Sequence, residues 1–404
     1  MYKDMHNIKN FLDSFDAQGF YPDFRNITKG VNEPVCIVDG EEYLMFCSNN
    51  YLGMTQNQDV KKAAKIAIDN YGVGPGGSRV ISGNVSVIEG LEKKIAELTL
   101  TDDSLTFPTG YMANIAIFQA MMDPLFDNTP QNSSEGVIFS DEFNHGSIVD
   151  GCRLSRAKKV VFKHDDLDDL RKKISENDLP NKLIVTEGVF SLEGEIIDVP
   201  KYIEITKSVG AKLMIDDAHG IGVLGENGGG VGEYFNCADG IDILMGCMDK
   251  AFGGTGGYLA GSKSLIKYLR IASRSSLLSS ALPTGMAGAM IESVNQIMHG
   301  QDLRKDLFEK AKYLKESLIN AGFQVLGRND IPSVPLFIGD EKLGIQFANI
   351  LWEQKIFSPV VRWPAVPMGQ SRLRIIVMVN HTKQQLDQFI NACKIAGKRL
   401  GIIG

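Results

Sequence analysis

Short apolar runs of the kind that form buried β-strands alternate with amphipathic helical patterns through the middle of the chain. The strand-like runs cover residues 136–140, 159–162, 182–187, 211–216 and 241–246. Apolar residues repeat at helical spacing from Val60 to Tyr71 and from Ile88 to Leu98. Because helices that connect successive strands leave those strands parallel, this alternation predicts an α/β fold with a largely parallel central sheet flanked by helices.

The chain of 404 residues is longer than one small core usually organises, so we expect a large domain with a smaller lobe attached. A Ser-rich stretch ends at Leu282–Pro283, and a long amphipathic helical pattern follows it. We predict an N-terminal segment over residues 1–47, a large domain over 48–290 and a smaller α+β C-terminal domain over 291–404. The polar segment 123–135 is typical of a surface loop.

Composition and charge argue against several classes of protein. No run approaches the roughly 18 apolar residues of a membrane helix. A net charge of -7 without a long basic block makes nucleic acid an unexpected partner. Residues 1–16 lack the apolar core and cleavage site of a signal peptide, so we expect a cytoplasmic protein. The six cysteines form no CxxC pair, which argues against a zinc ribbon and a disulfide framework, and we expect no metal site.

The segment Gly72–Gly77 satisfies the GxGxxG pattern of dinucleotide-binding folds. That motif must follow a strand and open a helix. Here it follows the helical pattern that ends at Tyr71 and leads into Ser78. The context therefore argues against an NAD or FAD site.

Four further segments each carry a weak signal. Gly110 and Tyr111 follow a strand-like run and open an apolar helical pattern, so their backbone amides could hold a phosphate. His145 comes shortly after another strand, although a lone histidine is more often structural. The strand over 211–216 ends in Asp216, with His219 three residues later, and strand ends in α/β sheets face the ligand crevice.

Lys250 follows an apolar strand and precedes the glycines Gly253 and Gly254. On its own, such a lysine is typical of a surface loop. The combination has a chemical logic, because pyridoxal 5'-phosphate (PLP) needs a lysine amine for a Schiff base, a carboxylate for its ring nitrogen, an aromatic plane and phosphate donors. Lys250, Asp216, His145 and the amides of residues 110–111 supply one of each.

The chain resembles the α-oxoamine synthases, a family of fold-type I PLP enzymes. Its members include 2-amino-3-ketobutyrate CoA ligase, serine palmitoyltransferase, 8-amino-7-oxononanoate synthase and 5-aminolevulinate synthase. The resemblance rests on segments in family order, which are residues 48–53, 77–79, 109–114, 141–147, 186–191, 216–220, the Lys250 loop, 372–374 and 381–382. It implies a fold-type I transferase over nearly the whole chain.

For the cofactor, the resemblance implies that His145 stacks on the ring, Asp216 pairs with the ring nitrogen and His219 bonds the phenolic oxygen. Ser191 would lie near the same edge. Asn114, in the segment that opens with Thr109 and Gly110, would belong to the cofactor site.

For the substrate, the resemblance implies that Arg374 clamps the amino-acid carboxylate with its planar guanidinium. Ser78 would contact the substrate, and Asn50 would approach the same site from the partner subunit. Ser279 would reach across a dimer interface to the phosphate. A homodimer with shared active sites is therefore implied.

Two segments depart from the family pattern. The family usually reads Thr-x-Ser-Lys or Thr-x-Gly-Lys, whereas this chain reads Cys247-Met248-Asp249-Lys250. It has lost a hydroxyl donor and gained an acid, and we expect Asp249 to point away from the phosphate toward a basic neighbour. The family's Arg-Pro-aromatic segment becomes Arg274-Ser275-Ser276, which would reshape the acyl entrance.

The implied reaction joins a small α-amino acid to an acyl-CoA and gives an α-amino ketone, CoA and, in decarboxylating members, CO2, with Lys250 as the base at the α-carbon. The segment 397–404 favours the ketobutyrate ligase (glycine C-acetyltransferase) and serine palmitoyltransferase branches. Three alternatives stay open. They are an 8-amino-7-oxononanoate synthase, another fold-type I enzyme such as an aminotransferase, and a PLP-binding regulatory protein without catalysis.

Overall fold

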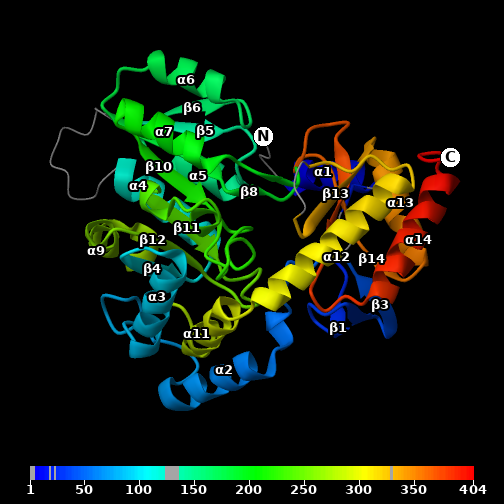
Figure 1. Cartoon of the computed structure of the whole chain (residues 1–404), viewed down its shortest axis with the longest axis horizontal. Coiled ribbons are helices and arrows are strands. Elements are labelled where there is room, and N and C mark those ends of the chain that lie inside the picture. Colours follow the sequence, from blue (N-terminus) through cyan, green and yellow to red (C-terminus); the bar gives the residue numbers. More distant parts are fainter. Residues whose placement is uncertain (1–4, 18–19, 22–23, 123–135, 328–330) are drawn as a thin grey trace.

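The structure, a computed structural model, describes residues 5–17, 20–21, 24–122, 136–327 and 331–404. The predicted surface loop 123–135 lies outside the described residues. Two lobes stand side by side, with the central sheet and its helices in one and the C-terminal elements in the other (Figure 1).

A seven-stranded sheet with the strand order β4-β12-β11-β10-β7-β5-β6 forms the centre of the larger lobe. Its strands are β4 (Asp103–Phe107), β5 (Gly136–Asp141), β6 (Lys158–Phe162), β7 (Asn181–Glu187), β10 (Lys212–Asp216), β11 (Ile243–Cys247) and β12 (Gly257–Gly261). β12 runs antiparallel to both of its neighbours, and the remaining pairs in the sheet are parallel. The α/β prediction is confirmed, and each strand-like run in the sequence lies on one of these strands.

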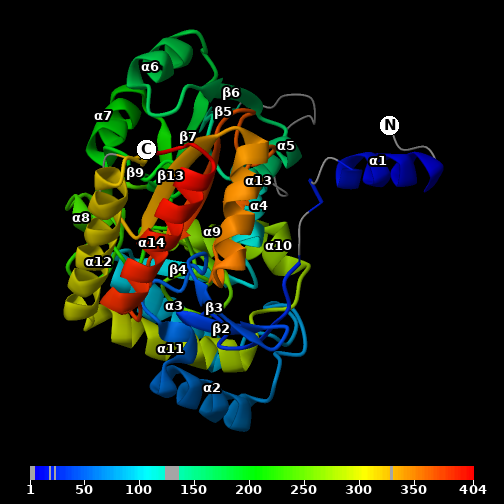
Figure 2. The same ribbon diagram turned by 90° about the vertical axis from the view of Figure 1, so that its right-hand side faces the viewer.

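Helices cover both faces of this sheet (Figures 1 and 2). The helices of this lobe are α2 (Gln58–Tyr71), α3 (Ser86–Thr99), α4 (Gly110–Met122), α5 (Gly146–Leu154), α6 (Leu167–Ser175), α7 (Val199–Val209), α8 (Val231–Tyr234), α9 (Lys263–Ala272), α10 (Arg274–Leu277) and α11 (Thr284–Met298). Successive strand residues join different apolar clusters, because side chains alternate along a strand. Leu213 and Ile215 pack in one cluster and Met214 in the other. Each face of the sheet therefore has its own core.

The smaller lobe combines the two ends of the chain. A four-stranded sheet has the order β1-β2-β3-β14, and a three-stranded sheet has the order β13-β16-β15. The strands are β1 (Ile27–Lys29), β2 (Val35–Val38), β3 (Glu41–Met45), β13 (Ser333–Gly339), β14 (Ile356–Phe357), β15 (Val360–Val361) and β16 (Ser371–Ile376). The helices are α12 (Gln301–Asn320), α13 (Glu341–Glu353) and α14 (Lys383–Arg399). The boundary at residue 290 stays a prediction, and that residue lies within α11.

The short elements complete the described chain. They are the N-terminal helix α1 (Met5–Ala17), the 3-10 turns η1 (Met54–Gln56) and η2 (Ala238–Gly240), and the hairpin of β8 (Val189–Phe190) with β9 (Glu195–Ile196). In Figure 2, α1 stands apart from both lobes. Within the described ranges, no helix has the length and apolar character needed to cross a membrane.

The sheet topology places the predicted site residues together. β5, β7, β10 and β11 are parallel, so their carboxyl ends lie at one edge of the sheet. Asp141, Glu187, Asp216 and Cys247 are the last residues of these strands. Open α/β sheets bind their ligands at this edge.

Candidate active site

Asp216 is a buried carboxylate that neighbouring groups hold in place. Its side chain accepts hydrogen bonds from Asn114 Nδ2 at 2.9 Å and from the backbone amide of Ala218 at 3.1 Å. Asn114 lies on α4 and also donates to Ser147 Oγ at 2.9 Å. Asp216 is 5 % exposed. Two donors therefore fix the orientation of this carboxyl group in a buried place.

His145 begins α5 and leaves its ring exposed at the same edge. Its Nδ1 lies 2.7 Å from Ser147 Oγ, which fixes the ring orientation. The backbone amide of His145 donates to Glu187 Oε1 at 2.7 Å. Burial, followed by the charge of Asp216, raises the pKa of Glu187 well above its ordinary value. Glu187 was not among the residues predicted for the site, although it lies in the segment 186–191.

Asp217, beside Asp216 in the sequence, has a different environment. It is fully buried and accepts a hydrogen bond from the Val231 amide at 2.8 Å. Three glycines surround its carboxyl, since a Cβ at Gly188, Gly220 or Gly230 would lie 2.6, 2.1 or 2.0 Å from an Asp217 oxygen. Burial raises the pKa of Asp217 well above its ordinary value. Asp217 therefore organises the loops, and Asp216 is the acid that Asn114 presents at the sheet edge.

His219 has a partner at each ring nitrogen. The Tyr51 hydroxyl lies 2.8 Å from Nδ1, and Ser191 Oγ lies 3.2 Å from Nε2. Burial and the positive charges of Lys250 and Arg374 lower the pKa of His219 well below its ordinary value. The imidazole is therefore neutral at physiological pH and can donate one hydrogen bond and accept another. Tyr51 is a site residue that was not predicted individually, although it belongs to the segment 48–53.

Lys250 is not the surface lysine that its glycine-rich context alone suggests. Its side chain is 12 % exposed, and its Nζ lies 3.7 Å from Asp249 Oδ1. Burial lowers the pKa of Lys250, but the acidic groups around it, among them Asp249 and Asp216, outweigh this effect, and the pKa lies above its ordinary value. Asp249 thus contacts Lys250, and its orientation relative to the phosphate stays a prediction.

The start of α4 packs tightly against the strand that leads to Lys250. A Cβ at Gly110 would lie 2.0 Å from Cys247 Sγ, so glycine is required there. Gly110 and Tyr111 are the first residues of α4, where backbone amides lack acceptors within the helix. Burial raises the pKa of the Cys247 thiol to about 12. An uncharged thiol therefore replaces a hydroxyl beside the predicted phosphate site.

Arg374 on β16 connects the two lobes. Its Nε donates to Ser191 Oγ at 3.1 Å, and its Nη2 donates to Asn49 Oδ1 at 2.8 Å. Asn49, which belongs to the same chain, thus lies beside Arg374, and the approach of Asn50 into the partner subunit's site stays a prediction. The Asn50 side chain instead donates to Asn32 O at 2.7 Å and accepts from the Thr55 amide at 3.2 Å. These local bonds hold Asn50 away from Arg374.

Ser78 and Ser279 lie on two surface segments that contact each other. Ser78 is in the loop between α2 and α3, and Ser279 follows α10. The Ala281 amide donates to Gly77 O at 3.0 Å, which joins the segments. Within the described residues, no hydrogen bond links either serine side chain to Lys250, Asp216 or His219. Their roles toward substrate and phosphate stay predictions.

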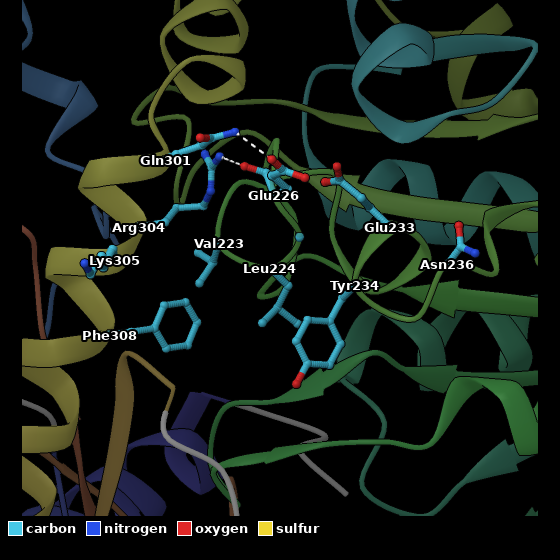
Figure 3. Close-up of a pocket in the computed structure, with 11 residues that line it drawn as sticks. Val223, Leu224, Glu226, Glu233, Tyr234, Asn236, Gln301, Arg304, Lys305 and Phe308 are labelled. Carbon is cyan, nitrogen blue, oxygen red and sulfur yellow. Dashed lines mark hydrogen bonds between the residues drawn. The ribbon is translucent and has the colours of Figure 1, made fainter.

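A cavity of about 680 Å³ lies between α8 and α12 (Figure 3). Its lining includes Tyr234 from α8 and Arg304 and Phe308 from α12, with Val223 and Leu224 between them. Val223 and Leu224 also line a narrow cavity with Tyr51, Ser191 and His219. The larger cavity holds none of the predicted site residues, so we do not assign the reaction to it.

Comparison with known proteins agrees with this geometry. A family model described as aminotransferase class I and II matches residues 41–393. The 8-amino-7-oxononanoate synthase of Thermoanaerobacter pseudethanolicus is 39 % identical over 402 residues, which cover 99 % of each chain. That of Lysinibacillus sphaericus is 39 % identical over 393 residues, or 97 % of this chain and 98 % of the relative. The chain belongs to the α-oxoamine synthase family.

Solved structures of α-oxoamine synthases share the fold. Serine palmitoyltransferase from Sphingomonas wittichii matches with a TM-score of 0.91 and 27 % identity over 98 % of both chains. A serine palmitoyltransferase with a PLP internal aldimine matches with a TM-score of 0.92 and 26 % identity over 99 % of this chain and all of the other. The protein is therefore a fold-type I PLP enzyme and an acyltransferase, as the resemblance implied.

The comparisons name both branches considered for this α-oxoamine synthase. The sequence relatives carry the name of the branch that we treated as an alternative, and the two serine palmitoyltransferases carry that of a branch we favoured. Since the relatives are named enzymes, the non-catalytic alternative gains no support.

The residues present fit PLP. An acceptor is ready for a protonated ring nitrogen, because Asp216 and the side-chain oxygen of Asn114 lie together in a buried place. Within the described residues, that Asn114 oxygen is buried without a hydrogen-bond partner. His145 offers an exposed ring, and Lys250 offers an amine.

Proposed function

We propose that the protein catalyses the C-acylation of a small α-amino acid by an acyl-CoA thioester, with release of CoA, CO2 and an α-amino ketone. The observation that carries this proposal is the position of the Arg374 guanidinium. It reaches from the smaller lobe to Ser191, whose hydroxyl also contacts His219. A carboxylate clamp thus adjoins the predicted cofactor site.

Each residue has a role that its contacts support. When bound, PLP supplies a protonated pyridine ring that withdraws electrons from the substrate α-carbon. Asp216 would hold the ring nitrogen of the cofactor, because Asn114 and Ala218 orient its carboxyl group by hydrogen bonds. His219 would donate a hydrogen bond to the phenolic oxygen. Lys250 would hold the cofactor through its amine and move a proton at the substrate α-carbon.

The amino-acid carboxylate would be held by Arg374 together with Asn49 and Ser191. A planar guanidinium bonds a carboxylate through two parallel N–H groups. The bonds from Arg374 to Asn49 and Ser191 set the orientation of that plane. Asn49 is therefore added to the proposed set of substrate-binding residues, beside Asn50 of the partner subunit.

The names of the relatives indicate the substrates. The product 8-amino-7-oxononanoate is a nine-carbon chain with an amine on C8 and a ketone on C7. Breaking its C7–C8 bond leaves a two-carbon fragment that corresponds to alanine after loss of CO2, and a seven-carbon ω-carboxyacyl group. We therefore propose alanine and such an acyl thioester as the first pair to test.

A homodimer with shared active sites is part of the proposal. Large apolar side chains are exposed beside Ser78 and Ser279, with Ile81 82 % exposed and Leu278 77 % exposed. The helix α1 adds an exposed apolar side chain, Phe11. A monomer rarely leaves so much apolar surface in water, and a second copy would cover it. A cytoplasmic location is also proposed, supported by six cysteines that form no disulfide, all within the described residues.

The test is a matrix of amino acids against acyl-CoA esters, read as free thiol released. Alanine, glycine and serine would each be paired with pimeloyl-CoA, acetyl-CoA and palmitoyl-CoA, with Lys250→Ala as the inactive control. We expect alanine with pimeloyl-CoA to release thiol fastest. Amino transfer to an α-keto acid without thiol release would establish the aminotransferase alternative. An absence of both reactions would contradict the proposed function.

A further inference from the structure

Asp249 occupies a position between the Lys250 amine and the start of α4. Its carboxylate lies 3.7 Å from Lys250 Nζ and also bonds the Cys247 thiol. Cys247 in turn packs against Gly110, the first residue of α4. The Asp249 side chain is 49 % exposed, whereas that of Lys250 is 12 % exposed. An acid at the rim of the site thus reaches inward to a nearly buried amine.

Among the charged and titratable groups around Lys250, only Asp249 of the described residues makes an ion-pair contact with its ammonium group. The titratable and charged groups that act on Lys250, or on which it acts, are Cys247, Asp249, Asp216, Tyr51, Glu187 and His219. Asp216 already accepts from Asn114 and Ala218. Burial keeps the Cys247 thiol and the Tyr51 phenol protonated, since it raises the pKa of each. Within the described residues, Asp249 is the carboxylate with an ion-pair contact to Lys250.

We propose that Asp249 is a positioning residue that holds Lys250 as an ammonium ion whenever the amine is not bound to the cofactor. The proposal rests on the Schiff-base role proposed for Lys250. The ion pair between Asp249 and Lys250 must break before the lysine reacts with the cofactor. The serine or glycine that is usual in the family at this position would not form this ion pair.

The chemistry of cofactor capture makes the effect of this ion pair measurable. Neutral Nζ attacks the aldehyde carbon, the C=O bond is replaced by C=N, and the aldehyde oxygen leaves as water. An ammonium has no free electron pair, so it must first give its proton to the buffer. A nearby anion stabilises the ammonium and lowers the fraction of neutral amine. Capture near neutral pH should therefore be slower than in a protein without the acid.

The experiment measures the rate of Schiff-base formation from its visible absorbance, after the cofactor has been stripped from the full-length protein. Asp249→Asn removes the charge and keeps the shape, while Asp178→Asn removes one charge from an exposed loop as a control. Each protein is mixed with PLP and, separately, with pyridoxal, which has the same aldehyde but no phosphate. We expect Asp249→Asn to react about tenfold faster with both aldehydes at pH about 7, and the gain to shrink as the pH rises through the pKa of the parental Lys250, which lies above its ordinary value.

Other outcomes overturn the inference. A faster reaction with PLP alone would show that Asp249 repels the phosphate and does not act on the lysine. Equal rates for Asp249→Asn and the parent would show that the ion pair has no effect. Failure of the underlying function is seen separately, because Lys250→Ala should form no Schiff base with either aldehyde. If that variant formed one, another lysine would be the attachment site.

Discussion

The guanidinium of Arg374 donates a hydrogen bond to the side-chain oxygen of Asn49 over 2.8 Å, joining residues that are 325 positions apart in the chain. Asn49 follows the small N-terminal sheet and Arg374 lies on β16, so the contact brings the two ends of the chain to the site. The neighbouring amide, Asn50, makes only local contacts in the described structure. Within one chain, Asn49 and not Asn50 therefore contacts Arg374.

The two asparagines should respond differently to truncation. Asn49→Ala removes a partner of Arg374 and should raise the KM for the amino acid by about tenfold, the value of one hydrogen bond to a charged group. Asn50→Ala should lower the melting temperature more, since it removes bonds to Asn32 and Thr55, and should also raise that KM if Asn50 reaches the partner subunit's site. Steady-state kinetics and thermal unfolding of both variants check this. An unchanged KM in Asn49→Ala would remove Asn49 from the proposed site.

Arg374→Lys should weaken the amino acid selectively. Lysine keeps the positive charge but loses the planar fork and cannot bond Asn49, Ser191 and a carboxylate together. We expect the KM for the amino acid to rise much more than the KM for the acyl-CoA. Arg372→Lys is the matched control, because Arg372 bonds Leu192 O and Glu193. A parallel loss for both substrates in Arg374→Lys would indicate a folding defect.

The strands of the central sheet could be predicted because their residues are apolar on both faces, as at Leu213, Met214 and Ile215. The place of Lys250, Asp216, His145 and His219 at one edge of the sheet could be predicted, because Asp216 ends a strand and the other three follow strands. The contact between Asn49 and Arg374 could not be predicted. It depends on the turn at residues 48–53 and on a strand from the other end of the chain, and no local sequence pattern shows that these two segments contact each other.

Glu187 and Asp217 could not be predicted either, because their burial depends on segments that are distant in the sequence. Both are ordinary acids in sequence, and each becomes a site or loop element only because the fold encloses it. The glycines around Asp217 come from three segments of the chain. Only the fold shows that Gly188, Gly220 and Gly230 all leave room for the same carboxyl group. Tyr51 similarly gains its role from its contact with His219.

Asp216→Asn should retain cofactor and lose most of the activity. The asparagine side chain has the same shape as that of Asp216, but an amide cannot hold a proton on the ring nitrogen as an anion does. We expect kcat to fall by about 100-fold, or about 2.7 kcal/mol in activation free energy, while the visible cofactor absorbance persists. Thiol release and absorbance measured on one preparation test this. Activity at the parental rate would assign the ring nitrogen to a different acid.

Asp217 should make the stability depend on pH. Its pKa in the folded protein is raised by burial, so the folded state keeps a proton that the unfolded state releases above pH about 4. The stability contributed by the neutral acid is complete below that pH and is lost as the pH rises through the folded pKa. Asp217→Asn cannot ionise, so its urea midpoint should fall less than the parental one between pH about 5 and 8. Equal slopes would show that Asp217 is ionised when folded.

The attachment of PLP to Lys250 is tested most directly by borohydride reduction of the cofactor-loaded protein, followed by trypsin digestion and mass spectrometry. Reduction makes the lysine–cofactor bond permanent and prevents cleavage at the modified lysine. We expect one uncut peptide over residues 213–263 that carries the phosphopyridoxyl group on Lys250. Cleavage after Lys250, with the group found on another lysine, would contradict the assignment.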